Sequence, residues 1–194
     1  MLEKRTKMNK IKEFFKEYGS IISKILINHI AMMIFGIIVL IAAKGINDVL
    51  FHIAGVVAIL MYMFLLYMIM WELGSKDSVR VETQRMKRDN LLGLKISLVA
   101  NAIFIVMAVV LLILSFFITE GESGINNVCG VIKIILHYFF GMYLSITYLA
   151  PSFYAIYLIV IIPAIVCCTL SYIAGVSGKK CLFPDKKKDK NQKR

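Results

Sequence analysis

The chain has 194 residues, of which 59% are hydrophobic and 18% charged, and its formal net charge is +11. Soluble domains are typically about half apolar and a quarter charged, so this composition indicates an integral membrane protein and argues against a soluble domain. The positive charge could suggest a nucleic-acid partner, but the bases lie in short blocks between long uncharged runs, which is typical of a multi-span membrane protein.

A polar, basic leader over 1–24 is followed by apolar runs long enough to span a bilayer. The leader is too long and polar, and the first apolar run too long, for a cleaved signal peptide, so this run is predicted to be an uncleaved anchor. The last run contains Pro163, where we expect a kink. The predicted spans are 25–43, 49–71, 96–118 and 153–174.

The distribution of lysine and arginine predicts the orientation of the spans. Of the 23 bases, 7 lie in the leader, 6 in residues 72–95 and 8 after residue 175, which leaves Lys44 and Lys133. The connection 119–127 has two glutamates and no base. Because basic segments stay on the cytoplasmic side, both termini and the 72–95 segment are predicted to be cytoplasmic.

The apolar runs and the distribution of charge therefore divide the chain into three predicted parts. Residues 1–24 are a cytoplasmic leader, 25–175 one membrane domain, and 176–194 a basic cytoplasmic tail that we expect to be disordered. The fold class is all-α, with four transmembrane helices and one further helix described below. A bacterial cytoplasmic membrane with anionic inner-leaflet lipid is the expected location.

The segment 72–95 is the most polar internal stretch. Gly74 and Ser75 predict a turn after the second span, followed by a short helix capped by Asp77 or Ser78. The bases either fix orientation only, or contact a membrane or cytosolic protein partner or anionic lipid. No aromatic side chains alternate with them, so nucleic acid is not expected. The candidate contact residues are Asp77, Arg80, Arg85, Lys87, Arg88, Asp89 and Lys95.

The same segment carries a resemblance. The pattern G-x-K-D-x-x-x-V and then R-x-x-R-D-x-x-x-G-L-K-x-x-L-x-A-N, from Gly74 to Asn101, resembles a cytoplasmic loop of small bacterial multi-span membrane proteins of unknown function. The stretch I-P-A…S-Y-I-A-G, from Ile162 to Gly175, is similar to the end of their last span. The resemblance implies a shared fold and no known activity.

A fifth apolar stretch, Val128 to Leu149, is also long enough to span. As a fifth span it would place the basic tail outside, against the charge distribution. Its polar residues Lys133, His137, Gly141 and Ser145 recur every four residues. We therefore predict a helix at the outer interface or a re-entrant helix, with a true fifth span as the alternative. Lys133 and His137 are its candidate contacts with headgroups or an outer ligand.

Polar residues inside the predicted spans are few. Asn28 and His29 lie near the inner end of the first span, and Asn101 lies about two turns into the third. They are predicted to form hydrogen bonds between helices, or else a polar gate. The central parts of the four spans contain no Asp, Glu, Lys or Arg, which argues against a proton-coupled transporter that acts alone.

The four cysteines form no C-x-x-C pair and no metal-ligand spacing, and no catalytic motif is present. No cofactor or metal is expected. The favoured hypothesis is a non-enzymatic accessory, regulatory or immunity-type protein that acts through partners. A small transporter or pore, with 128–149 as a re-entrant lid, is the alternative. A membrane enzyme, with His137 as acid or base, is the least favoured.

Overall fold

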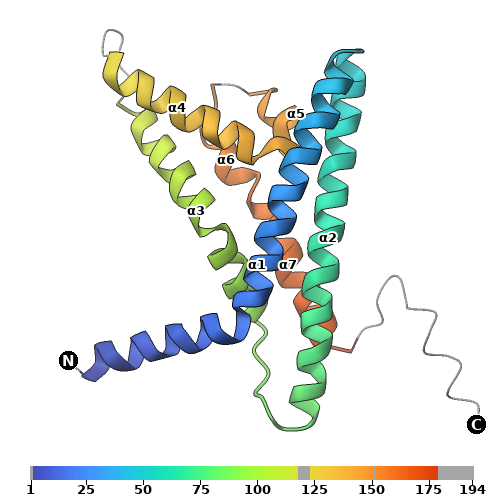
Figure 1. Cartoon of the computed structure of the whole chain (residues 1–194), viewed down its shortest axis with the longest axis vertical. Coiled ribbons are helices and arrows are strands. Elements are labelled where there is room, and N and C mark those ends of the chain that lie inside the picture. The colour runs from blue at the N-terminus through green and yellow to red at the C-terminus, as the bar shows by residue number, and fades with distance from the viewer. Residues whose placement is uncertain (1, 118–122, 151, 179–194) are drawn as a thin grey trace, which may run out of the picture.

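The computed structural model of the chain describes residues 2–117, 123–150 and 152–178. All regular elements in these ranges are helical, which confirms the predicted all-α class (Figure 1). The predicted tail lies outside the described residues from 179 onward. The elements are α1 (Leu2–Lys44), α2 (Asp48–Glu82), α3 (Leu92–Ser115), α4 (Ser123–Phe139), the 3-10 turn η1 (Gly141–Tyr143), α5 (Leu144–Thr147), α6 (Ile156–Ile159) and α7 (Ile162–Val176).

Four helical segments are long and apolar enough to cross a membrane, which confirms the four predicted spans. They belong to α1, α2, α3 and the α6–α7 pair. The last is interrupted before Ile162, and Pro163 lies in the first turn of α7. Proline is tolerated there because it lacks an N–H and the first helical N–H groups have no partner within the helix. The predicted kink at Pro163 is therefore a helix start.

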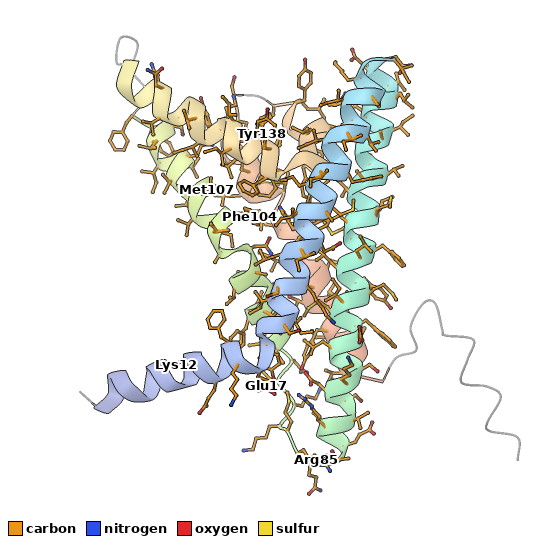
Figure 2. The ribbon with its side chains drawn as sticks, viewed as in Figure 1. Lys12, Glu17, Arg85, Phe104, Met107 and Tyr138 are labelled. Carbon is orange, nitrogen blue, oxygen red and sulfur yellow. The ribbon has the colours of Figure 1, made fainter. Side chains whose placement is uncertain are left out.

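The predicted leader is the first part of α1 rather than a separate segment. Figure 1 shows this part of α1 running at a steep angle to the rest, and Figure 2 places Lys12 on it and Glu17 close to the bend. Tyr18 is buried while Lys12 and Lys16 are exposed. The N-terminal arm therefore leaves the bundle at the level where α1 begins to pack.

The predicted turn at Gly74 and Ser75 was wrong, because α2 continues through both residues to Glu82. Gly74 serves helix packing instead. A Cβ atom on Gly74 would lie 2.4 Å from the carbonyl oxygen of Tyr172, and one on Gly175 would lie 2.5 Å from that of Trp71. The backbones of α2 and α7 touch at this crossing, which only glycine permits. The chain turns later, over residues 83–91.

Residues 128–149 form a bent element, with α4 and the η1–α5 segment meeting at 90°. A Cβ on Gly141, at the bend, would lie 2.5 Å from the carbonyl oxygen of Met33, and one on Gly36 would lie 2.6 Å from the backbone of Met142. Gly36 and Met33 precede the end of α1 at Lys44 by about 12 to 16 Å along the helix axis. This distance is about half of a hydrocarbon core about 30 Å thick, which agrees with the re-entrant form of the prediction.

The bend breaks the predicted ladder of polar residues, because a ladder needs one continuous helix. Lys133 and His137 lie on α4, whereas Gly141 and Ser145 lie beyond it and contact other helices. A Cβ on Gly55 of α2 would collide with the Ser145 hydroxyl. Close packing of this bent element (128–149), which we call the hairpin, on α1 and α2 therefore explains Gly36, Gly55 and Gly141 together.

The ends of the helices lie at two opposite ends of the bundle (Figure 1). The N-terminal arm, the end of α2, the loop 83–91 and the end of α7 lie at one end of the bundle, which we call the basic end. The turn after Lys44 and residues 148–150 and 152–155 lie at the other, where the Lys44 ammonium is 4.8 Å from the centre of the Tyr148 ring. The described part of α7 thus ends on the same side of the bundle as the N-terminal arm. This is expected if the chain crosses the membrane an even number of times.

Candidate functional site

The loop 83–91 at the basic end has a defined conformation. Gln84 has a left-handed backbone with φ of 57°. The Asp89 carboxylate accepts hydrogen bonds from the Leu91 N–H at 2.9 Å and the Lys95 ammonium at 2.6 Å. The bond from Lys95 is the main reason that the pKa of Asp89 lies below its ordinary value. Asp89 is therefore ionised at neutral pH and fixes the end of the loop.

Arg88 joins this loop to α7. Its guanidinium donates to the side-chain oxygen of Asn90 at 2.8 Å and to the Ser177 hydroxyl at 3.1 Å. Arg85 and Lys87 are exposed and line an open hollow of about 450 Å³. Of the predicted contact residues, Asp89, Lys95 and Arg88 thus hold the loop, and Arg85 and Lys87 are presented to the surroundings.

Asp77 is buried, so it is not available to a partner. Its carboxylate accepts a hydrogen bond from the Tyr172 hydroxyl at 3.1 Å and lies 3.4 Å from the Arg80 guanidinium. Arg80 also lies 3.3 Å from Glu17 at the bend of α1. Asp77 and Arg80 thus connect α2 with α7 and with α1. Sequence reasoning missed Tyr172; the available signal was a tyrosine inside an apolar run, since a buried hydroxyl usually has a partner.

Replacing Asp77 with alanine is expected to destabilise the fold by about 1–3 kcal/mol, because the Tyr172 hydroxyl then loses its buried acceptor. The measurement is thermal unfolding of the purified protein in mild detergent. The matched control is Glu72→Ala on the same helix, which removes an exposed pair with Lys76 and should cost under about 0.5 kcal/mol. Equal losses in the two variants would contradict a structural role for Asp77.

His29 is the centre of a polar contact within the membrane. Its Nε2 lies 3.0 Å from the backbone oxygen of Phe139, and its Nδ1 lies 3.0 Å from the Tyr62 hydroxyl. A carbonyl can only accept, so we assign the proton to Nε2 and let Tyr62 donate to Nδ1. The imidazole also stacks on Phe104 of α3, labelled in Figure 2, with ring centres 4.5 Å apart.

This contact is between helices, as one of the two sequence hypotheses expected for His29. His29 donates a hydrogen bond to the Phe139 carbonyl at the end of α4. The last carbonyls of a helix have no hydrogen-bond partner within the helix, so this bond supplies one. His29 on α1 therefore joins α2, α3 and the hairpin at one point. Sequence reasoning missed Tyr62 and Phe139, because the bend that brings the end of α4 to this depth leaves no signature in the apolar pattern.

The other two predicted intramembrane residues do not join this contact. Asn101 is buried and its amide donates to the Ser97 carbonyl of its own helix at 2.9 Å. Among the described residues, the Nδ2 atom of Asn28 is buried without a hydrogen-bond partner. No hydrogen bond in that part of the chain joins Asn28, His29 and Asn101 into one polar gate.

Lys133 and His137 line the same hollow, of about 390 Å³, between α1 and α4. A second hollow of about 240 Å³ adjoins it, and Ile41, His137 and Leu144 line both. Lys44 lines the second. We call the two hollows together the outer groove. His137 is half-buried there, and its Nδ1 is the hydrogen-bond partner of the Tyr157 hydroxyl on α6.

No family model, no curated protein and no solved structure matches the chain. The resemblance of Gly74–Asn101 and Ile162–Gly175 to small bacterial membrane proteins therefore stays a prediction that rests on the quoted motifs.

Proposed function

We propose that the protein is a non-enzymatic accessory, regulatory or immunity-type protein of the bacterial cytoplasmic membrane that binds a protein partner through the loop 83–91. The observation that carries this proposal is the ordered loop at the end of a helix longer than the bilayer is thick. At 1.5 Å per residue, the 35 residues of α2 are about 52 Å long. The whole bilayer measures about 40–45 Å.

The position of Trp71 makes this argument more specific. An indole ring favours the membrane–water interface, and Trp71 lies 11 residues before the end of α2. The end of α2 therefore lies about 16 Å beyond that interface, whereas the headgroup region is roughly 5–7 Å thick. With Trp71 at the interface, Arg85 and Lys87 are expected to lie past the headgroups, in the range of a protein surface. Two exposed bases beside an open hollow favour an acidic partner.

The cytoplasmic location of the basic end is part of the proposal. The charge distribution supports it, since the leader, the 72–95 segment and the tail hold all but two of the bases. Reporter fusions to the C-terminus test it, and an external C-terminus would contradict it.

The partner is tested by purification of the tagged, full-length protein from its native membrane in mild detergent. We expect a stoichiometric protein to co-purify with the wild type and to be lost with Arg85→Gln plus Lys87→Gln. These substitutions remove two exposed charges and leave the Asp89 and Arg88 hydrogen bonds in place. The matched control, Lys24→Gln plus Lys76→Gln, removes two exposed charges from the adjacent helices and should retain the partner.

Three outcomes would contradict the proposal. Repeated recovery of the chain without a stoichiometric protein would exclude a stable partner. If the loop variants changed only the efficiency or direction of membrane insertion, the bases would serve orientation alone. Loss of binding to anionic vesicles in the loop variants, with no protein recovered, would show that the loop contacts lipid instead.

The hairpin favours a second candidate function, a small transporter or pore. Re-entrant elements near the midplane are found where membrane proteins form a site or a gate. This function predicts solute or ion flux in liposomes that contain only this protein. Liposomes without flux across a broad panel of solutes, with insertion verified, would remove it.

A further inference from the structure

We propose that the outer groove binds one anionic glycerophospholipid from the adjacent leaflet, with an acyl chain between α1 and α4 and the phosphate on Lys133. The proposal does not depend on the protein partner, because the groove lies at the opposite end of the bundle from the loop 83–91 (Figure 1).

The shape and chemistry of the groove fit an acyl chain. Its larger hollow, about 390 Å³, lies in the range of small-ligand pockets. Its walls are mainly aliphatic, from Ile37, Ile41, Ile134 and Leu144, and its α1 wall covers about 10 Å of the outer part of the helix. Ile41 and Ile134 are both more than half exposed, so the groove is open to the side, where lipid lies.

The charged groups of the groove are basic. Lys133 lines one hollow and Lys44 the other, and no acidic side chain lines either. Both ammonium groups lie over aromatic rings: Lys133 is 5.5 Å from the centre of the Tyr154 ring, and Lys44 is 5.4 Å from that of Phe51. Lys44 also pairs with Asp48. Lys133 lines the larger hollow, so we take its ammonium as the group that binds the phosphate.

The depth of Lys133 favours an anionic headgroup over a neutral one. Lys133 is half-buried and lies six residues before the end of α4, which itself reaches the bend near the midplane. It is thus at most about 9 Å above that end. An ammonium in the outer part of the hydrocarbon is costly, and a phosphate drawn toward it lowers that cost. A zwitterionic lipid supplies the same chain without the net charge.

The test is the thermal unfolding midpoint of the full-length protein in detergent, titrated with phosphatidylglycerol or phosphatidylcholine. A ligand that binds the folded state raises the midpoint, and a tighter ligand does so at a lower concentration. We expect phosphatidylglycerol to act at lower concentration than phosphatidylcholine. Lys133→Gln should weaken the effect of phosphatidylglycerol roughly fivefold, and that of phosphatidylcholine, whose choline offsets the phosphate charge, by less. Lys133→Arg, which keeps the charge, should behave like the wild type.

Two further variants test the groove itself. Ile134→Trp, which fills it, should abolish the response to phosphatidylglycerol, whereas Ile103→Trp on the exposed face of α3 should not. Lys76→Gln, at the other end of the bundle, controls for net charge. Equal responses to the two lipids, or equal effects of Lys133→Gln and Lys76→Gln, would overturn the proposal. A midpoint raised as much by inorganic phosphate as by phosphatidylglycerol would overturn the acyl-chain site.

Discussion

Gly175→Ala is expected to lower the unfolding free energy in detergent by about 1–3 kcal/mol, the cost of extra volume in a packed contact. The added Cβ would lie 2.5 Å from the carbonyl oxygen of Trp71 and 2.9 Å from the backbone nitrogen of Ser75. Both are backbone atoms, so no side chain can rotate away. The two helices must separate, which loosens the contact that α2 and α7 make beside Asp77.

Glycine-to-alanine controls make the sign of this prediction informative. A Cβ on Gly130 of α4 or on Gly19 of α1 meets no atom within 4 Å. Alanine is a better helix former by up to about 1 kcal/mol, so Gly130→Ala and Gly19→Ala should leave stability unchanged or raise it. If all three variants shifted the unfolding midpoint in the same direction, close packing at Gly175 would not be the cause.

The apolar runs were sufficient to predict the four spans, because a bilayer imposes a minimum length of apolar helix that shows directly in the sequence. The same rule could not distinguish a span from a hairpin over 128–149, since both need about twenty apolar residues. The charge distribution favoured an interfacial or re-entrant helix, because five crossings would have separated the basic tail from the basic leader. The sequence could not locate the bend, because Gly141 is informative only once Met33 and Gly36 are known to lie opposite.

The candidate site residues also divide into those whose exposure could be predicted from the sequence and those whose burial could not. Arg85 and Lys87 are exposed where a polar loop between spans was predicted. Asp77 belongs to the same polar stretch but is buried, because α2 continues through Gly74 and brings the carboxylate against Tyr172 of α7. Nothing local distinguishes the two cases, since burial depends on a partner 95 residues away. Gly74 is compatible with both cases, because glycine in an apolar helix permits close packing as well as a turn.

His29→Phe is expected to destabilise the protein by about 1–3 kcal/mol and to loosen the hairpin. Phenylalanine keeps an aromatic ring against Phe104, so the change mainly removes the two hydrogen bonds. The carbonyl of Phe139 then loses its donor, and the Tyr62 hydroxyl loses its acceptor. Within a membrane neither group can turn to water, so the loss should exceed that of a surface hydrogen bond.

The expected result has two readouts, which separate a local effect from a global one. Thermal unfolding in detergent gives the overall loss, with His52→Phe as the control, since His52 is a half-buried histidine on α2 outside the hairpin contact. Thiol labelling reports on the hairpin, because Cys129 of α4 is only 3% exposed. In a background with the other cysteines replaced by serine, His29→Phe should speed labelling of Cys129 below the unfolding midpoint. Unchanged labelling with a lowered midpoint would show that His29 stabilises the bundle without holding α4, and so would contradict its role as the partner of the Phe139 carbonyl.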